Sequence, residues 1–447
     1  MRAGENGHRA APRPAAPRRA LRVLYVAHNH PTLHPGGAEA YALELYEQMR
    51  ETPGVEPILL ARIGSNVARR RVSHPGTPFS SVNGDPNQHF VFTETEHFDF
   101  FTLTSRDKSL YSRHLTDFLL AQRPDVVHIQ HTHFIGLDLL SQIRRVLPHV
   151  PIVYTLHEFL PICHRDGQMV RTFSSELCKE ASPRRCNECF PEISPQSFFL
   201  RQRFVKGHLE NVDRFIAPSA QLMERYLQWG IEPRRIEVEE YGRRRPAARA
   251  PDPARAKRPT NIGFFGQLSR FKGAKVMLEA MSLLAEDCGA HLWLHGANLE
   301  LQTPEFQEEF AAMHDSVRER VTFRGPYEHA ELPKLMADLH WVLVPSVWWE
   351  NSPLVIQEAF FHRRPIICSD VGGMAEKVSD GVDGIHFRVG DAFSLARVFE
   401  RASGDPRLWR SLRAGIREPY AMDAHVTRLL DTYGELVERR RAVTVDG

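Results

Sequence analysis

The sequence alternates short apolar runs with helix-forming segments, and this order limits the folds open to the chain. The first apolar run, residues 21–27 (LRVLYVA), is followed by a polar loop and then by residues 38–50, where apolar side chains recur at four-residue spacing. That spacing predicts a helix, and the apolar run at residues 55–61 predicts a second strand. A strand, a helix and a strand in this order form a βαβ unit and predict a parallel sheet.

Further apolar runs continue the pattern in two groups. The first group adds residues 124–131 and 151–158, and the second contains residues 260–267, 290–296, 320–325, 340–346 and 364–370, alternating with helices such as residues 274–286. Several of these runs end in polar residues, where open α/β sheets place their ligands. The sequence therefore predicts an α/β fold with two doubly wound domains and a ligand in the cleft between them.

Composition places the boundaries of these domains. The stretch 241–259 is rich in Pro, Ala and Arg, as interdomain linkers are. We expect its Arg243–Arg245 run to be solvated rather than bound to phosphate. The predicted parts are a disordered tail (1–20), an N-terminal domain (21–240) with a cysteine-rich insert (157–190), a linker (241–259), a C-terminal domain (260–420) and a last helical segment (421–447) that packs back across the domain boundary.

Charge and hydropathy exclude several classes of protein. The formal net charge of +2 gives no support for nucleic-acid binding. No apolar run approaches the roughly 20 residues that span a bilayer. The segment 1–20 lacks the apolar core of a signal peptide. We therefore expect a cytoplasmic protein in a reducing compartment.

Two glutamates, Glu350 and Glu358, stand seven residues apart in the stretch VPSVWWENSPLVIQEAF. Ser352 followed by Pro353 predicts a helix start, because Ser is a preferred N-cap and Pro suits the first helical position. A helix N-terminus offers unpaired N–H groups and a partial positive charge to an anion. Asn351 flanks the same place. A capped helix with one solvated and one paired glutamate is the alternative.

Three other short elements could contribute to the same site. Gly36 and Gly37 open the first predicted helix and allow close approach of a ligand to the backbone. His157 ends a predicted strand, and Lys272 follows the strand-and-turn segment FFGQLSRF with the charge to bind a phosphate. Taken singly, these elements are as well explained by a plain turn, a structural histidine and a solvated lysine.

Taken in order, the four elements resemble family 4 of the retaining, nucleotide-sugar-dependent glycosyltransferases, which have the GT-B fold. The resemblance runs from about Leu21 to the last helix. Its strongest part is residues 345–376, PSVWWENSPLVIQEAFFHRRPIICSDVGGMAE, which contains the E-x7-E pair and a following Gly-Gly. It implies two Rossmann-like domains facing across a cleft.

The resemblance also implies roles for individual residues. Glu350 would lie against the donor sugar and Glu358 would contact the donor's ribose. The implied catalytic residues are Glu350, His157 and Lys272, and the implied donor-binding residues are Gly36, Gly37, Gln267, Arg270, Lys272, Asn351, Ser352, Leu354 and Glu358. Gln267 departs from the family pattern, in which many members have an arginine; Arg270 or Lys275 would have to supply that charge.

The implied reaction transfers a sugar from a nucleoside-diphosphate sugar to an acceptor hydroxyl with retention of configuration. It needs neither a protein nucleophile nor a cofactor, because fixed positive groups stabilise the leaving diphosphate. A lipid-linked glycan or a cell-surface polysaccharide is the favoured acceptor, ahead of a small natural product. A nucleotide-sugar epimerase and a non-catalytic scaffold of the same fold are less favoured functions.

Four cysteines lie in the insert with the spacing C-x14-C-x7-C-x2-C. They are Cys163, Cys178, Cys186 and Cys189. Four thiolates suit a structural zinc site, with His164 as a substitute ligand, although only the last pair has typical zinc-knuckle spacing. Free thiols and two disulfides are the alternatives. The histidines of HNHPTLH and HIQHTH match no such spacing, and we expect them to have strand-end and loop roles.

The segment after the insert, SPQSFFLRQRFVKGHLENVDRF, mixes aromatic and basic residues. A helix with one buried face and one solvated basic face is the favoured interpretation. The alternative is a helix on the membrane surface that receives a lipid-linked acceptor, at the inner face of the membrane.

Overall fold

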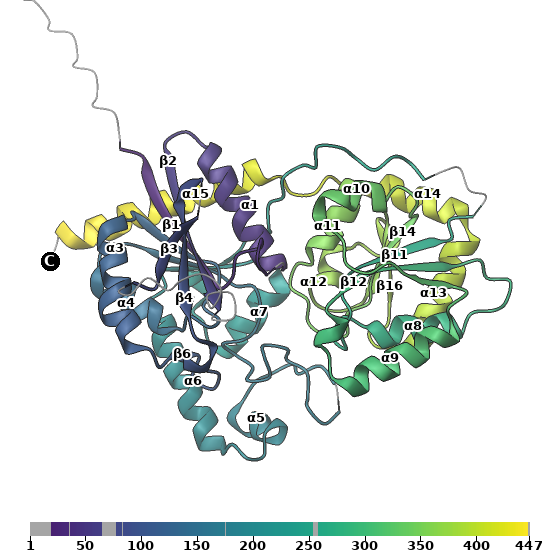
Figure 1. The fold of residues 1–447 in the computed structure, drawn as a ribbon, viewed down its shortest axis with the longest axis horizontal. Coiled ribbons are helices and arrows are strands. Elements are labelled where there is room, and N and C mark those ends of the chain that lie inside the picture. Colours follow the sequence, from purple (N-terminus) through teal and green to yellow (C-terminus); the bar gives the residue numbers. More distant parts are fainter. Residues whose placement is uncertain are drawn as a thin grey trace, which may run out of the picture.

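The computed structural model describes residues 19–34, 36–64, 77–82, 84–174, 176–253 and 258–445. The tail predicted for residues 1–20 lies outside this part except for its last two residues, and so do residues 254–257 of the predicted linker. The described chain forms two α/β domains that lie side by side (Figure 1). None of the described helices has the length and hydrophobicity needed to cross a membrane.

The N-terminal domain is built on an eight-stranded sheet in which only β3 runs antiparallel to its neighbour. In spatial order its strands are β10 (Ile236–Val238), β9 (Arg214–Ala217), β8 (Ile152–Thr155), β7 (Val126–Ile129), β1 (Leu21–Ala27), β2 (Val55–Gly64), β4 (Asp85–Thr93) and β3 (Phe79–Val82). A small hairpin of β5 (Phe98–Asp99) and β6 (Thr104–Ser105) lies apart from this sheet.

The C-terminal domain has a six-stranded sheet that is parallel throughout. Its order is β13 (Val321–Phe323), β12 (His291–Ala297), β11 (Asn261–Gln267), β14 (Trp341–Val344), β15 (Ile366–Ser369) and β16 (Gly384–Phe387). The order reverses between β11 and β14, and ligands bind beyond the strand ends at such a reversal in open parallel sheets.

Helices connect these strands. In the N-terminal domain they are α1 (Gly37–Glu51), a π-helix (Leu110–Leu115) that continues into α3 (Thr116–Gln122), α4 (Asp138–Val146), α5 (Pro183–Cys189), α6 (Pro195–Leu209) and α7 (Ala220–Trp229). In the C-terminal half they are α8 (Ala274–Ser282), α9 (Pro304–Ser316), α10 (Leu332–Leu335), α11 (Leu354–Phe361), α12 (Gly372–Lys377), α13 (Ala392–Gly404), α14 (Pro406–Gly415) and α15 (Met422–Val445).

The predicted strands are all present, and all but β13 are apolar runs buried over most of their length. Strands β7, β8, β14 and β15 are buried at every position. Strands β3, β4, β9, β10 and β16, and the short β5 and β6, were not among the predicted ones. The residues of β3 and β4 are largely polar and half-buried, so these two strands show no continuous apolar signal.

The last helix, α15, packs on the N-terminal domain although it follows the C-terminal domain in sequence (yellow in Figure 1). The hydroxyl of Tyr433 lies 3.3 Å from that of Tyr25 and 2.6 Å from Nδ1 of His128. Val426, Leu429 and Leu436 are buried in the same cluster. One helix therefore ties the end of the chain to its first strand.

The linker between the domains is not solvated at Arg243, so that prediction is wrong. Arg243 is 3% exposed and donates both Nε and Nη2 to the carboxylate of Glu44 on α1. Its Nη2 also lies 3.1 Å from Glu358 on α11. Arg244 pairs with Glu47 of α1. The acidic face of α1 therefore holds the basic run of the linker against the domain boundary.

Candidate active site

Glu350 lies in the loop between β14 and α11, where three side chains donate to one of its oxygens. Its Oε1 is 2.5 Å from Nζ of Lys272, 2.7 Å from Oγ of Ser346 and 2.9 Å from Nε1 of Trp348. Lys272 follows β11, the strand beside β14, so both loops leave the same sheet edge. The fold thus brings the predicted Glu350 and Lys272 into direct contact.

Two glycines let α12 begin against the backbone of this loop. A Cβ added at Gly373 would lie 1.7 Å from the carbonyl oxygen of Asn351, and one added at Gly372 would lie 2.7 Å from that of Glu350. The N–H of Gly373 donates to the Glu350 carbonyl at 2.5 Å. The Gly-Gly of the sequence motif is therefore required by the packing that fixes the Glu350 loop.

Helix α11 begins one residue later than predicted, and Ser352 is not its N-cap. The N-cap position is Pro353, and its side chain offers no cap hydrogen bond. The hydroxyl of Ser352 is buried and has no hydrogen-bond partner among the described residues. This hydroxyl can therefore donate a hydrogen bond to a ligand beside the helix N-terminus. Leu354 in the first turn is half-buried, and its side chain lies 3.8 Å from where a Cβ of Gly37 would be.

The starts of α1 and α11 therefore meet at the domain boundary. Gly36 has an extended backbone with φ of −160°, so its conformation does not itself require glycine. A Cβ there would lie 2.4 Å from the Glu39 carboxylate, so the glycine makes room for that group. Glu39 is buried, and its Oε1 lies 3.0 Å from Nε2 of His28. The sequence did not single out Glu39, because a glutamate in a first helical turn is common.

His157 joins the two domains through its backbone, because its carbonyl accepts a hydrogen bond from the Asn351 side chain. Both ring nitrogens also have partners: Nδ1 lies 2.5 Å from the Tyr241 hydroxyl and Nε2 lies 3.1 Å from Oε1 of Gln130. Burial lowers the pKa of His157 to about 3, and the nearby His28 adds to this effect. The ring is therefore neutral at physiological pH.

His157 belongs to a group of neighbouring histidines, whereas the sequence suggested a single histidine at a strand end. The rings of His28 and His131 are 4.1 Å apart, and His131 stacks with His157 at 6.4 Å. Nε2 of His131 lies 3.5 Å from Glu158, whose pKa burial raises to about 8. The sequence could have indicated this cluster, because its histidines and Glu158 follow β1, β7 and β8. The ends of these three strands share one sheet edge.

The other predicted donor residues lie on the C-terminal side of the boundary. Glu358 is bound by Arg243 and by Nε2 of His329, each at 3.1 Å. Burial raises the pKa of Glu358, but these two partners outweigh it and the net pKa is lowered. Gln267 is exposed at the end of β11, and Arg270 is exposed in the turn that follows.

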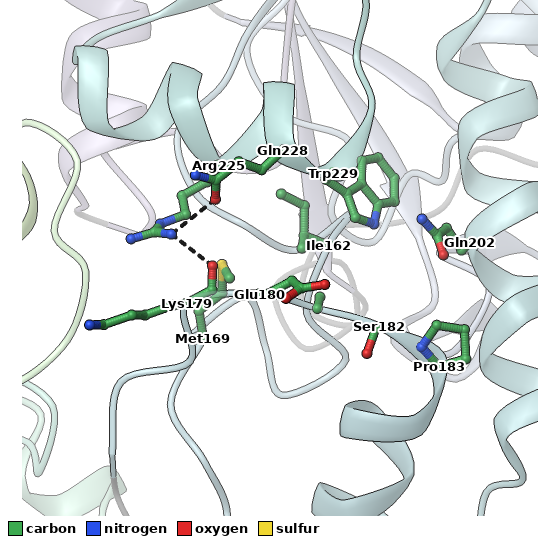
Figure 2. Close-up of a pocket in the computed structure, with 11 residues that line it drawn as sticks. Ile162, Met169, Lys179, Glu180, Ser182, Pro183, Gln202, Arg225, Gln228 and Trp229 are labelled. Atoms are coloured by element: carbon green, nitrogen blue, oxygen red, sulfur yellow. Dashed lines mark hydrogen bonds between the residues drawn. The ribbon is translucent and has the colours of Figure 1, made fainter.

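A cavity of about 210 Å³ lies in the N-terminal domain between the insert, α6 and α7 (Figure 2). Its lining includes Lys179, Glu180 and Trp229, but none of the residues predicted for the donor site. Arg225 at its edge donates to the Lys179 carbonyl at 2.7 Å. Among the described residues, no three His, Cys, Asp or Glu side chains are arranged as ligands of a common metal ion.

Comparisons with known proteins agree with this two-domain arrangement. A family model described as "Glycosyl transferase 4-like domain" matches residues 36–242, and one described as "Glycosyl transferases group 1" matches residues 259–405. Sucrose-phosphate synthase of Thermosynechococcus elongatus superposes with a TM-score of 0.68 over 94% of this chain and 100% of that chain, at 18% identity. The chain has the two domains of a GT-B glycosyltransferase.

A second GT-B structure, HepE of Anabaena in complex with UDP, gives a TM-score of 0.65 over 93% of this chain and 100% of that chain, at 15% identity. Among curated proteins, the D-inositol 3-phosphate glycosyltransferase of Salinispora tropica is 30% identical over 257 residues. That match covers 51% of this GT-B chain and 52% of the relative, so the chain spans about half the length of that relative.

Proposed function

We propose that this GT-B chain transfers a sugar from a nucleoside-diphosphate sugar to an acceptor hydroxyl, with retention of configuration. The observation that carries the proposal is the contact between Lys272 and Glu350 beside the start of α11. It sets a cation, a carboxylate and a helix N-terminus at the strand-order reversal of the C-terminal sheet. The solved relative with bound UDP supports a nucleotide donor.

The donor diphosphate would lie between Lys272 and the first turn of α11. Glu350 accepts one N–H of the ammonium, and because the Lys272 side chain is 31% exposed, its remaining N–H groups can reach a ligand. The Ser352 hydroxyl lacks a partner within the described chain, and the helix start adds unpaired backbone N–H groups. These donors favour an anion without a metal ion.

Bond cleavage builds negative charge on the leaving diphosphate, and fixed donors that point at that charge lower the barrier. The leaving phosphate then takes the proton of the acceptor hydroxyl on the same face of the sugar. No protein nucleophile forms a bond in this route. Glu350 holds the Lys272 ammonium in place and faces the donor sugar.

The acceptor would lie on the N-terminal side, near His157 and the histidines around it. His157 is neutral, and both of its ring nitrogens contact protein groups, Gln130 and Tyr241. If one of these hydrogen bonds breaks, that ring nitrogen can bind a sugar hydroxyl instead. Glu158 carries a proton at neutral pH because its pKa is raised to about 8. Neutral donors and acceptors suit a polyhydroxyl acceptor better than a charged one.

We further propose that this acceptor is lipid-linked or part of a cell-surface glycan. The support is the outer face of α6, where Phe199, Leu200 and Phe204 are 54%, 64% and 45% exposed. The favoured prediction for this helix, a solvated basic face, is wrong in part, since Arg201 is buried and donates to the carbonyl oxygens of Leu160 and Pro161. An exposed aromatic face suits contact with a lipid surface.

Donor binding and product stereochemistry test the proposal. We expect one of UDP, GDP or ADP, and its sugar, to raise the melting temperature of the wild-type chain by mass action. Lys272→Met should lose most of that shift, whereas Lys108→Met, which removes a cation paired with Asp138 on the surface of the N-terminal domain, should keep it. With an accepted donor, proton NMR of the product should show the donor's anomeric configuration. No shift with any nucleotide, or an inverted product, would overturn the proposal.

A further inference from the structure

The cysteine-rich insert contacts both loops that carry the proposed donor groups. Nε1 of Trp349 donates to the backbone carbonyl of Cys178 at 3.2 Å. The guanidinium carbon of Arg165 lies 5.3 Å from the ring centre of Phe271. Trp349 precedes Glu350, and Phe271 precedes Lys272. The insert therefore crosses the domain boundary at the two positions that place the carboxylate and the ammonium.

A third contact adds to this attachment. Arg225 of α7 lies over the indole of Trp349, with its guanidinium carbon 4.5 Å from the ring centre, and donates to the carbonyl of Lys179 in the insert. A cation over an indole is a favourable contact. Trp349 is thus held from one side by α7 and from the other by the Cys178 carbonyl.

Little regular structure holds the insert itself in place. Between residues 157 and 190 it has one helix, α5, and a single isolated bridge, Val170 with Leu177, within the part that the structure describes. Asp166 and Met169 have positive φ angles of 44° and 48°. The N–H of Cys178 donates to the Met169 carbonyl at 2.7 Å, and a constraint that acts on the whole insert would add to this local contact.

The four cysteines of the insert supply such a constraint, because they line one cavity. Cys163, Cys178, Cys186 and Cys189 surround a space of about 20 Å³ between the start of the insert and α5. All four are free thiols. Four sulfur ligands around so small a space suit a single soft metal ion.

The surroundings of the cavity match the charge of such a site. An ion with two positive charges and four thiolates has a net charge of −2. Arg165, Arg171, Arg201 and Arg225 each interact electrostatically with at least one of the four thiols. Arg171 is in addition paired with Glu188, and Arg201 with backbone carbonyls. Arg165 and Arg185 line the cavity itself, and cations at the cavity reduce the cost of a buried dianion.

We propose that the four thiols bind one zinc ion, and that this ion fixes the loop that holds Trp349 beside Glu350. On binding, four S–H groups release their protons and four Zn–S bonds form, with no change in oxidation state. The thiols must turn toward the cavity centre, because the described side chains are not yet arranged as ligands.

Metal analysis of the full chain tests the first half of the proposal without any assumption about activity. Protein purified without chelator should contain about one zinc per chain, and replacement by cobalt should give the intense absorption of thiolate-to-cobalt charge transfer. Cys186→Ser should lose most of the zinc, whereas Cys288→Ser, which changes a half-buried cysteine of the other domain, should keep it. A metal-free wild-type chain with four thiols that titrate, or with two disulfides, would overturn the site.

The second half of the proposal, that the zinc ion fixes the loop beside Glu350, rests on the proposed transferase function. Steady-state kinetics test it. Cys186→Ser and Trp349→Phe should each lower kcat/KM for the donor on the order of tenfold, because both release the Glu350 loop from the insert. Trp349→Phe should keep the zinc, which separates loss of the metal from loss of the contact. If Cys186→Ser loses zinc but keeps wild-type kcat and KM, the link to Glu350 is wrong. If no sugar transfer occurs in the wild type, the zinc result still stands alone.

Discussion

The side-chain amide of Asn351 donates to the backbone carbonyl of His157, so the loop of Glu350 in one domain is bonded to a strand end of the other. The bond spans the domain boundary next to the residues proposed to bind the donor. The His157 carbonyl lies just beyond the end of β8, so the contact joins the Glu350 loop to main chain and not to a mobile side chain.

Asn351→Ala should therefore impair transfer more than stability. We expect kcat/KM to fall on the order of ten- to a hundredfold, because the Glu350 loop loses its anchor on the other domain. The free energy of unfolding should change by only about 1 kcal/mol, the usual net value of one hydrogen bond. Asn211→Ala, which removes bonds to Ser141 and His208 away from the boundary, should cost stability alone. Equal kinetic losses in both variants would argue against a role for the contact.

Glu350→Gln separates the charge of this side chain from its shape. The amide oxygen can still accept from Ser346 and Trp348, but the ion pair with Lys272 is lost. We expect kcat to fall by roughly a hundred- to a thousandfold, as for other preorganised electrostatic groups. Steady-state kinetics with a saturating donor would measure it, with Glu319→Gln on the surface as the control. Wild-type turnover in Glu350→Gln would remove the residue from the proposed mechanism.

Gly373→Ala tests the packing under the same loop. The added methyl would overlap the Asn351 carbonyl, so we expect a loss of about 1–3 kcal/mol in the free energy of unfolding together with a loss of donor binding. Gly434→Ala is the matched control, since Gly434 is exposed within α15 and, apart from the neighbouring backbone of its own helix, no described atom lies within 4 Å of the new Cβ. That change should stabilise the chain by about 0.5–1 kcal/mol. Urea unfolding of both variants gives the comparison.

Glu158 should make the stability of the chain depend on pH. Its pKa is raised from 4.5 to about 8 in the fold, chiefly by burial. Between these values the unfolded chain has lost the proton that the folded chain retains, so the contribution of Glu158 to stability falls as pH rises through this window and stays level above it. Glu158→Gln should flatten that part of the curve. Urea midpoints of the wild type and Glu158→Gln, measured across this pH window, would show the effect. If both proteins lose stability equally with rising pH, the pKa of Glu158 is not raised in the fold.

The exposed face of α6 should bind anionic membranes if the proposed acceptor is lipid-linked. Replacing Phe199 and Phe204 together by Ser should reduce co-sedimentation with vesicles of anionic phospholipid severalfold, because two aromatic anchors are lost. Leu301→Ser changes a side chain that is 73% exposed in the other domain and should have no effect. Wild-type protein that stays in the supernatant at low salt would favour an acceptor in solution.

Much of the fold could be predicted because buried parallel strands are continuous apolar runs, and β1, β8, β11 and β14 all carry that signal. Strands β3 and β4 could not, since half-buried polar strands look like loops. The resemblance to a known family selected Glu350 and Lys272, and the structure places them in contact.

The partners of the site residues could not be predicted, because they come from distant parts of the chain. Arg243 meets Glu44 and Glu358 across separations of 199 and 115 residues, and nothing in a local pattern indicates such a contact. The capping role assigned to Ser352 failed for a similar reason. Its hydroxyl is buried without a hydrogen-bond partner in the described chain, and Pro353 takes the N-cap position instead.

The return of α15 to the N-terminal domain has a consequence for synthesis of the chain. Tyr25 and His128, in strands made early, meet the Tyr433 hydroxyl, which is made 408 residues after Tyr25. A nascent chain on the ribosome therefore lacks part of this core until α15 has been made. The N-terminal domain is completed only after the C-terminal domain, and a chain that stops before Met422 would leave those buried tyrosine and histidine groups facing water.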